Sequence, residues 1–111
     1  MHRKSTLPFV ARWNQPLRRF VVAEESMLPT LRPGDGIVGT RTRRIRRGEI
    51  RCFEHPARPG FWLVKRVGDV QTTTFQALSD RDVPGVVDSR RFGPVPIEGS
   101  YRVVVRVPRR R

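Results

Sequence analysis

Two residues of this chain have side chains and surroundings suited to catalysis. Ser26 stands just ahead of a turn stiffened by Pro29, and Lys65 is a lone lysine inside an apolar run further along the chain. A serine hydroxyl becomes a nucleophile when a base within hydrogen-bond reach takes its proton. Lysine can be that base when burial disfavours its charged form. The pair therefore indicates a serine protease that uses lysine where most such enzymes use histidine.

The alternation of a β-strand is the main argument for Lys65. It places Phe61, Leu63, Lys65 and Val67 on one, more apolar face. An ordinary lysine, with a pKa of ~10.4, is protonated at neutral pH, and lowering that pKa by two to three units costs about 3–4 kcal/mol. Lys4 is the only other lysine, and the arginines that supply the remaining positive charge cannot act as bases. The alternative is a lysine whose stem covers apolar surface while its ammonium group reaches water.

The surroundings of Ser26 are less informative. Pro29 lacks a backbone donor and restricts Leu28 to extended geometry, which fixes the chain just past the hydroxyl. Neither His2, in a basic N-terminal segment, nor His55, in a loop flanked by prolines, is well placed to be a base, and no orienting acid stands out. The local pattern by itself favours a helix cap or turn cap at Ser26 over a nucleophile.

Short strands account for most of the remaining sequence. They are predicted over residues 20–23, 35–40, 49–54, 61–67, 70–78 and 101–107, with turns at 32–35 and at Gly68-Asp69 and no convincing helix. This spacing predicts an all-β fold, a small single-domain barrel or sandwich of short antiparallel strands. We expect a flexible basic arm over 1–18, a β-rich domain over 19–108 and a basic tail over 109–111.

The composition limits the partners and the compartment. The net charge of +13 favours acidic partners such as nucleic acid or anionic lipid. Cys52 is the only cysteine, so no internal disulfide forms, and no apolar run approaches the ~20 residues that span a bilayer. We therefore expect a cytoplasmic chain without a transmembrane anchor. The sequence contains no cluster of metal ligands, and no cofactor is expected.

A binding module is the competing function. Residues 41–47 hold five arginines and read as an exposed loop, which could contact nucleic acid or an anionic surface. No basic stripe is interleaved with aromatic residues that could stack bases, so no specific nucleic-acid partner is expected. Phe9 and Trp13 lie near basic residues and leave weak peripheral membrane contact open.

Several blocks of the sequence together resemble the signal peptidase I superfamily. These blocks are Ser26-Met27-x-Pro29-Thr30-Leu31, Gly34-Asp35, Gly48-Glu49-Ile50, Val64-Lys65-Arg66-Val67, Ser79-Asp80 and Asp88-Ser89-Arg90-x-Phe92-Gly93-Pro94-Val95. Their order and spacing agree from about residue 20 to 105. The resemblance implies a Ser/Lys dyad endopeptidase on an all-β signal-peptidase-like core, without metal or cofactor.

The resemblance also implies a role for each matched residue. Ser26 would attack the scissile carbonyl, its backbone N–H would donate to the oxyanion, and neutral Lys65 would accept the proton from a hydroxyl within hydrogen-bond distance. The supporting residues would be Met27, Pro29, Asp80, Asp88 and Arg90, with Arg90 paired to one of the two aspartates. A protein precursor would bind as an added strand beside the one that enters Ser26.

The segment Phe92-Gly93-Pro94-Val95-Pro96 is most similar in type to the nickel-type superoxide dismutase maturation proteases, which remove an N-terminal propeptide. The chain departs from the family at Glu24, where glycine or serine is usual, and a carboxylate there would repel the oxyanion if it pointed inward. The alternative reading is a catalytically weak or inactive member of this fold that acts as a basic binding module.

Overall fold

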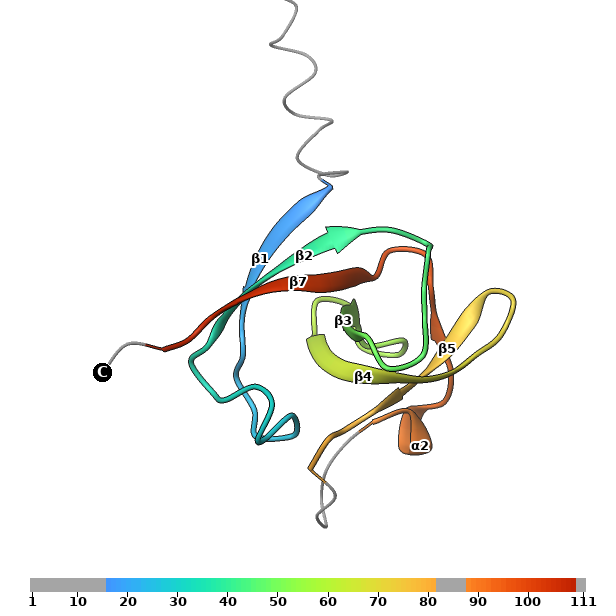
Figure 1. Ribbon diagram of the computed structural model, residues 1–111. Helices are drawn as coiled ribbons and strands as arrows, with labels where there is room; N and C mark the ends of the chain where they lie inside the picture. Colours follow the sequence, from blue (N-terminus) through green and yellow to red (C-terminus); the bar gives the residue numbers. More distant parts are fainter. Residues whose placement is uncertain (1–15, 82–87, 110–111) are drawn as a thin grey trace, which may run out of the picture.

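A computed structural model describes residues 16–81 and 88–109 of the chain. The strands are β1 (Leu17–Val21), β2 (Gly36–Arg41), β3 (Ile50–Glu54), β4 (Trp62–Val70), β5 (Thr74–Leu78), β6 (Val95–Pro96) and β7 (Tyr101–Val107), and α2 is a single turn of helix (Ser89–Phe92). They form one antiparallel sheet in the order β1-β2-β7-β3-β4-β5-β6. The sheet curls so that β1, β2 and β7 lie apart from β4 and β5 (Figure 1). The all-β prediction is confirmed, with β1 and β6 as the two edges of one open sheet.

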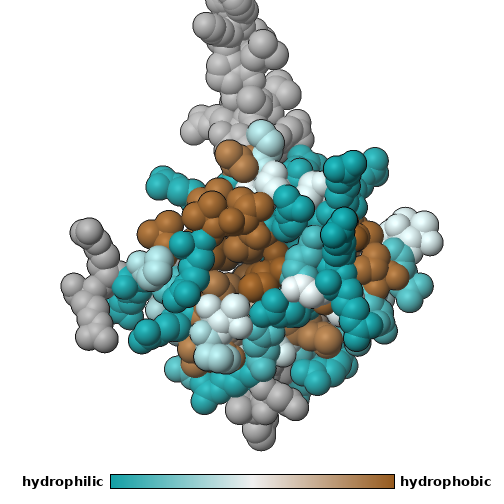
Figure 2. Space-filling view, in the orientation of Figure 1, coloured by the Kyte–Doolittle hydropathy of each residue, from teal (hydrophilic) through white to brown (hydrophobic). Residues whose placement is uncertain are grey.

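Two apolar clusters hold this sheet together. One contains Phe53, Leu63, Val67, Phe75, Ala77, Val95 and Ile97. The other contains Val22, Met27, Leu31, Ile37, Cys52 and Tyr101. The second cluster anchors the segment that carries Ser26, because Met27 is fully buried in it. On the face shown in Figure 2, hydrophilic side chains surround a central hollow where apolar residues gather.

Several sequence predictions hold and others need correction. The strand over 101–107 is confirmed, as is the turn at 32–35, where Gly34 has φ 94° and the Asp35 N–H donates to the Arg32 carbonyl at 3.0 Å. The turn predicted at Gly68-Asp69 is wrong: β4 runs on to Val70 through an irregularity in its pairing with β5. The chain reverses after it, where the Gln71 N–H donates to the Thr74 carbonyl at 2.8 Å.

The ends of the domain and its helix also differ from expectation. β1 begins at Leu17, inside the predicted arm, of which residues 1–15 lie outside the described part. The backbone N–H of Arg109, in the predicted tail, donates to Asp35 Oδ1 at 3.0 Å. The helical turn α2 was not predicted, and Asp88 starts it by accepting a hydrogen bond from the Arg90 N–H. No helix in the described part of the chain is long and apolar enough to cross a membrane.

Buried Arg51 organises the arginine-rich loop between β2 and β3. Its guanidinium donates to the carbonyls of Thr42 and Arg44, both at 2.6 Å, and to Ser100 Oγ at 2.8 Å. Its side chain is 0% exposed and is paired with Glu49 at 3.1 Å. The other ion pairs of this loop are more exposed, and such pairs contribute little to stability.

We predict that Arg51→Met lowers the free energy of unfolding by about 3–5 kcal/mol, because it leaves the buried Ser100 hydroxyl, two partly buried carbonyl groups and Glu49 without their donor. Arg43→Met is the matched control, since the Arg43 side chain is 79% exposed. It should change stability by less than about 0.5 kcal/mol. Urea unfolding of both variants measures the difference, and equal effects would contradict the anchoring role of Arg51.

Candidate active site

Lys65 lies on the buried face of β4. Leu63, Lys65 and Val67 point inward from this strand while Val64 and Arg66 are only partly buried, so the alternation predicted from the sequence is confirmed. Lys65 is 0% exposed, and its Nζ donates to Ser79 Oγ at 3.1 Å. Burial lowers the pKa of Lys65 below its ordinary value, against the negative charges of Glu24 and Asp88, which raise it.

Ser26 lies in a series of tight turns that follows β1. The Leu28 N–H donates to the Glu25 carbonyl at 3.1 Å and the Leu31 N–H to the Met27 carbonyl at 2.9 Å, so Ser26 lies inside the first of these turns and the second follows it. The residue itself is 8% exposed. Among the described residues, neither its hydroxyl nor its backbone N–H has a hydrogen-bond partner. Both groups are thus available to a substrate, as a nucleophile and an oxyanion donor would need to be.

Three residues after β5 connect the two candidates. Ser79 accepts the hydrogen bond from Lys65, and the Arg81 N–H donates to the Ser26 carbonyl at 2.8 Å. The Arg81 side chain also pairs with Glu25 at 2.7 Å. Residues 79–81 therefore contact the lysine at one end and the serine at the other.

Asp80, between these contacts, joins the serine segment to the lysine strand. Its carboxylate accepts from Thr30 Oγ1 at 2.7 Å, from Arg66 Nε at 3.0 Å and from another nitrogen of that guanidinium at 2.6 Å. The hydrogen bonds from Arg66 lower the pKa of Asp80, so it remains ionised. The expectation of a supporting role at Asp80 thus has a structural basis, with Arg66 and not Arg90 as its partner.

Asp88 and Arg90 form the other pair, at 2.8 Å. Burial by itself would raise the pKa of Asp88, but hydrogen bonds from the Arg90 side chain and from the N–H groups of Ser79 and Arg90 lower it to about 2. The bond from the Ser79 N–H, at 3.0 Å, is the one that bears on the site. It fixes the backbone of the residue whose hydroxyl holds Lys65.

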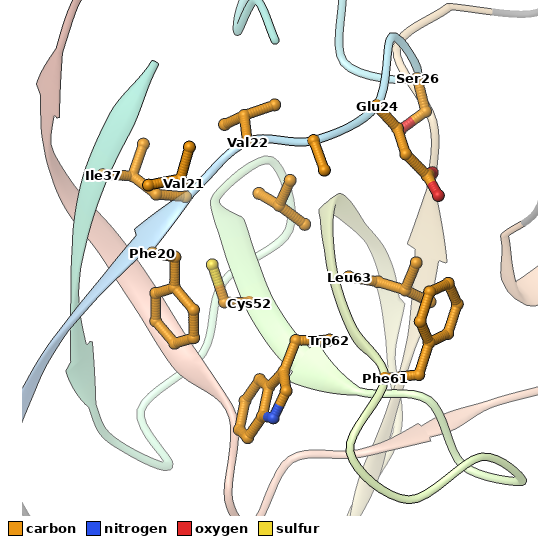
Figure 3. Close-up of a pocket in the computed structure, with 12 residues that line it drawn as sticks. Phe20, Val21, Val22, Glu24, Ser26, Ile37, Cys52, Phe61, Trp62 and Leu63 are labelled. Carbon is orange, nitrogen blue, oxygen red and sulfur yellow. The ribbon is translucent and has the colours of Figure 1, made fainter. Parts of the chain in front are cut away.

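An apolar pocket of about 100 Å³ opens beside Ser26. It is lined by Phe20, Val21, Val22, Ala23, Glu24, Ser26, Ile37, Cys52, Phe61, Trp62, Leu63 and Val64. Figure 3 shows Ser26 and Glu24 at one end of this pocket, with the Glu24 side chain extending in the direction of Leu63 and Phe61. The strands that bear Lys65 and that lead to Ser26 thus provide opposite walls of one cavity.

The hydrogen bond expected between Ser26 and Lys65 is not formed in this structure; the partner of Lys65 is Ser79. Catalytic hydrogen bonds are often long without substrate and tighten when it binds. His55 is not an alternative base, since its Nδ1 accepts from the Ala57 N–H at 3.0 Å, its ring packs on Phe92 and Phe61, and it does not itself line the pocket. Within the described residues, no group of His, Cys, Asp and Glu side chains could hold a metal ion.

Ser79, Thr30 and Arg66 are the site residues that sequence reasoning missed. All three belong to recognised blocks, but none was singled out as a site residue. The pairing of Arg66 with Leu78 puts Lys65 and Ser79 at the next position along the hairpin. Finding this pair from the sequence needs both the correct β4–β5 turn and the register shift between Val67 and Val70, because without the shift Asp80 would lie opposite Lys65.

A comparison with protein families matches the part of the chain that carries most of this site. The model of the family described as Signal peptidase, peptidase S26 matches residues 7–81. This match includes Ser26, Lys65 and Asp80. Comparison with curated proteins gives no match.

We predict that the pKa of Lys65 lies below the ~10.4 of a free lysine. A Lys4→Arg variant leaves Lys65 as the only lysine, so its ammonium or amine nitrogen can be titrated by ¹⁵N NMR without overlap. Adding Glu24→Gln should lower the pKa further, because the ionised carboxylate raises it. Adding Glu25→Gln, whose carboxylate is paired with Arg81, serves as the control. A Lys65 pKa at or above the free value would contradict the role of burial.

Proposed function

Because the chain belongs to the signal peptidase family, peptidase S26, a family of serine peptidases, we propose that it is an endopeptidase with Ser26 as nucleophile and Lys65 as general base. The observation that carries this proposal is the complete burial of Lys65 on the strand whose Leu63 and Val64 line the Ser26 pocket. A surface lysine would remain protonated at neutral pH and could not accept a proton. A lysine with a depressed pKa can do so.

In the proposed reaction Ser26 is the nucleophile and Lys65 transfers the proton. Lys65 Nζ, once neutral, takes the proton of the Ser26 hydroxyl as Oγ attacks the scissile carbonyl carbon. The oxyanion accepts a hydrogen bond from the unpartnered Ser26 N–H, a donor typically worth ~3–4 kcal/mol. Lys65 then gives the proton to the leaving amine as the C–N bond breaks. Water attacks the resulting ester as Lys65 accepts its proton, and Lys65 returns that proton to Ser26 Oγ as the bond between the acyl carbon and Oγ breaks.

Ser79 is a positioning residue for this lysine. Its hydroxyl accepts from Lys65 Nζ, and its own N–H is held by Asp88. One donor of the ammonium group is thereby held by Ser79. The remaining positions on nitrogen are left for the proton transfer, so Ser79 acts by orienting Lys65.

We propose an extended segment of a protein precursor as the substrate. Among the described strands β1 is an edge strand that leads directly toward Ser26, and that edge can pair with an added strand. Side chains of that strand would enter the apolar pocket. The resemblance to the nickel-type superoxide dismutase maturation proteases makes an N-terminal propeptide of that precursor the first substrate to test. We place the reaction in the cytoplasm, since a single cysteine gives no support for an oxidising compartment.

We predict that Ser26→Ala and Lys65→Met each reduce cleavage of a co-expressed precursor by at least about 10³-fold, because loss of either residue of a catalytic pair removes most of the activity of the pair. Both variants should remain folded, since Lys65→Met replaces a buried amine with an apolar group of similar length. Mass spectrometry of the precursor measures cleavage, and circular dichroism checks the fold. Full activity in either folded variant would contradict the dyad and favour the binding-module alternative.

We also predict that kcat/KM rises with pH as Lys65 loses its proton. Only the neutral amine can accept the Ser26 proton, and the lowered pKa brings this rise below that of an ordinary lysine. The profile is measured with a fixed peptide substrate after checking that the protein stays folded across the range. A flat profile from about pH 6 to about pH 10 would argue against a lysine base.

A further inference from the structure

Glu24 differs from the other carboxylates of this protein. Every other Asp or Glu that the structure describes accepts a hydrogen bond from a protein group: Glu25 from Arg81, Asp35 from Arg106, Glu49 from Arg51, Glu54 from the Gly60 N–H, Asp69 from Arg47, Asp80 from Arg66, Asp88 from Arg90 and Glu98 from Arg43. Glu24 has no hydrogen bond or ion pair within the same described residues. In a chain with 23 lysines and arginines, a carboxylate without a partner is unusual.

The position of Glu24 suggests what it could bind. It is exposed, lies two residues before Ser26 and lines the same pocket, whose other walls are almost wholly apolar. In Figure 3 its carboxylate extends in the direction of Leu63 and Phe61. A side chain entering this pocket would therefore meet apolar walls along its stem and one negative charge at the opening.

We propose that Glu24 selects substrates that carry a basic side chain, lysine or arginine, at the position facing this pocket. This inference rests on the proposed peptidase function and specifies its substrate class. Lysine and arginine have the required form, an aliphatic stem that packs on apolar surface and a cationic head that stays near water. The head would pair with the Glu24 carboxylate, and the stem would lie against Leu63 or Phe61.

The surrounding charge strengthens this selection. The net charge of +13 would on average repel a basic peptide, so a local negative group is needed to accept one. The neighbouring carboxylate of Glu25 cannot serve, because Arg81 neutralises it at 2.7 Å. Among the described residues that line this pocket, Glu24 is thus the acidic one that can pair with a ligand.

Pairing with a substrate cation would also remove an obstacle to catalysis. An ionised Glu24 beside Ser26 opposes the negative charge that develops on the substrate oxygen, and it favours the protonated form of Lys65. A bound lysine or arginine head offsets that charge. The correct substrate would then improve both the oxyanion environment and the base, so selection would appear in kcat as well as in KM.

The test separates binding from cleavage. Ser26→Ala protein is titrated with fluorescein-labelled peptides of Ala and Val in which one position at a time is lysine, norleucine or glutamate, and anisotropy reports binding. At one position of the peptide, we expect the lysine peptide to bind roughly fivefold more tightly than the norleucine peptide. The glutamate peptide should bind more weakly than both. Adding Glu24→Gln should abolish the difference between lysine and norleucine, while adding Glu25→Gln should preserve it.

Equal binding of the lysine and norleucine peptides, a lysine preference that survives Glu24→Gln, or no measurable binding of any lysine peptide would overturn the proposal. The same peptides are then incubated with the protein carrying intact Ser26. Cleavage without a lysine preference would leave the peptidase function standing and remove the role of Glu24. A Glu24-dependent preference in binding, without cleavage, would support Glu24 as the selective residue and count against the peptidase function.

Discussion

The hydrogen-bonded group of Thr30, Asp80 and Arg66 is the interaction on which the geometry of the site depends. Ser26 belongs to an irregular segment and Lys65 to a regular strand, and nothing in local sequence fixes the distance between them. Asp80 supplies that constraint, because its carboxylate binds Thr30 on the serine segment and Arg66 beside the lysine. Both contacts are partly buried, where charge-assisted hydrogen bonds are stronger than on an open surface.

Whereas the Asp80 contacts stabilise the fold, burial of Lys65 lowers its stability. Its pKa is lower in the folded protein than in the unfolded chain, so the unfolded state binds the proton more tightly at neutral pH. The cost is fully present below the folded pKa and disappears as the pH rises to the ordinary lysine value. A methionine at this position would avoid it. The fold therefore retains a buried lysine that lowers its stability. Such a cost is expected of a catalytic base more than of a structural residue.

The sequence predicted the regular features and missed those that depend on pairing between distant residues. Strand alternation placed Lys65 inside, and the proline–glycine pair located the turn before β2, because both signals are local. The β4–β5 turn was misplaced because Gly68-Asp69 resembles a hairpin turn, whereas Gly68 is buried within the continuing strand. That error hid Ser79, whose role follows only from the register of the hairpin. The Asp80–Arg66 partnership likewise depends on tertiary structure.

The two carboxylates that act on Lys65 show how its protonation could respond to substrate. Asp88 is tied to Arg90 and to backbone N–H groups, so its charge is compensated within the fold and its effect on Lys65 is constant. Glu24 acts on the same lysine but lines an open pocket and makes no hydrogen bond or ion pair among the described residues. A ligand can therefore change the influence of Glu24 and not that of Asp88. A side chain that binds at Glu24 would thus adjust the base itself, so in this site substrate selection and proton transfer would be coupled through one carboxylate.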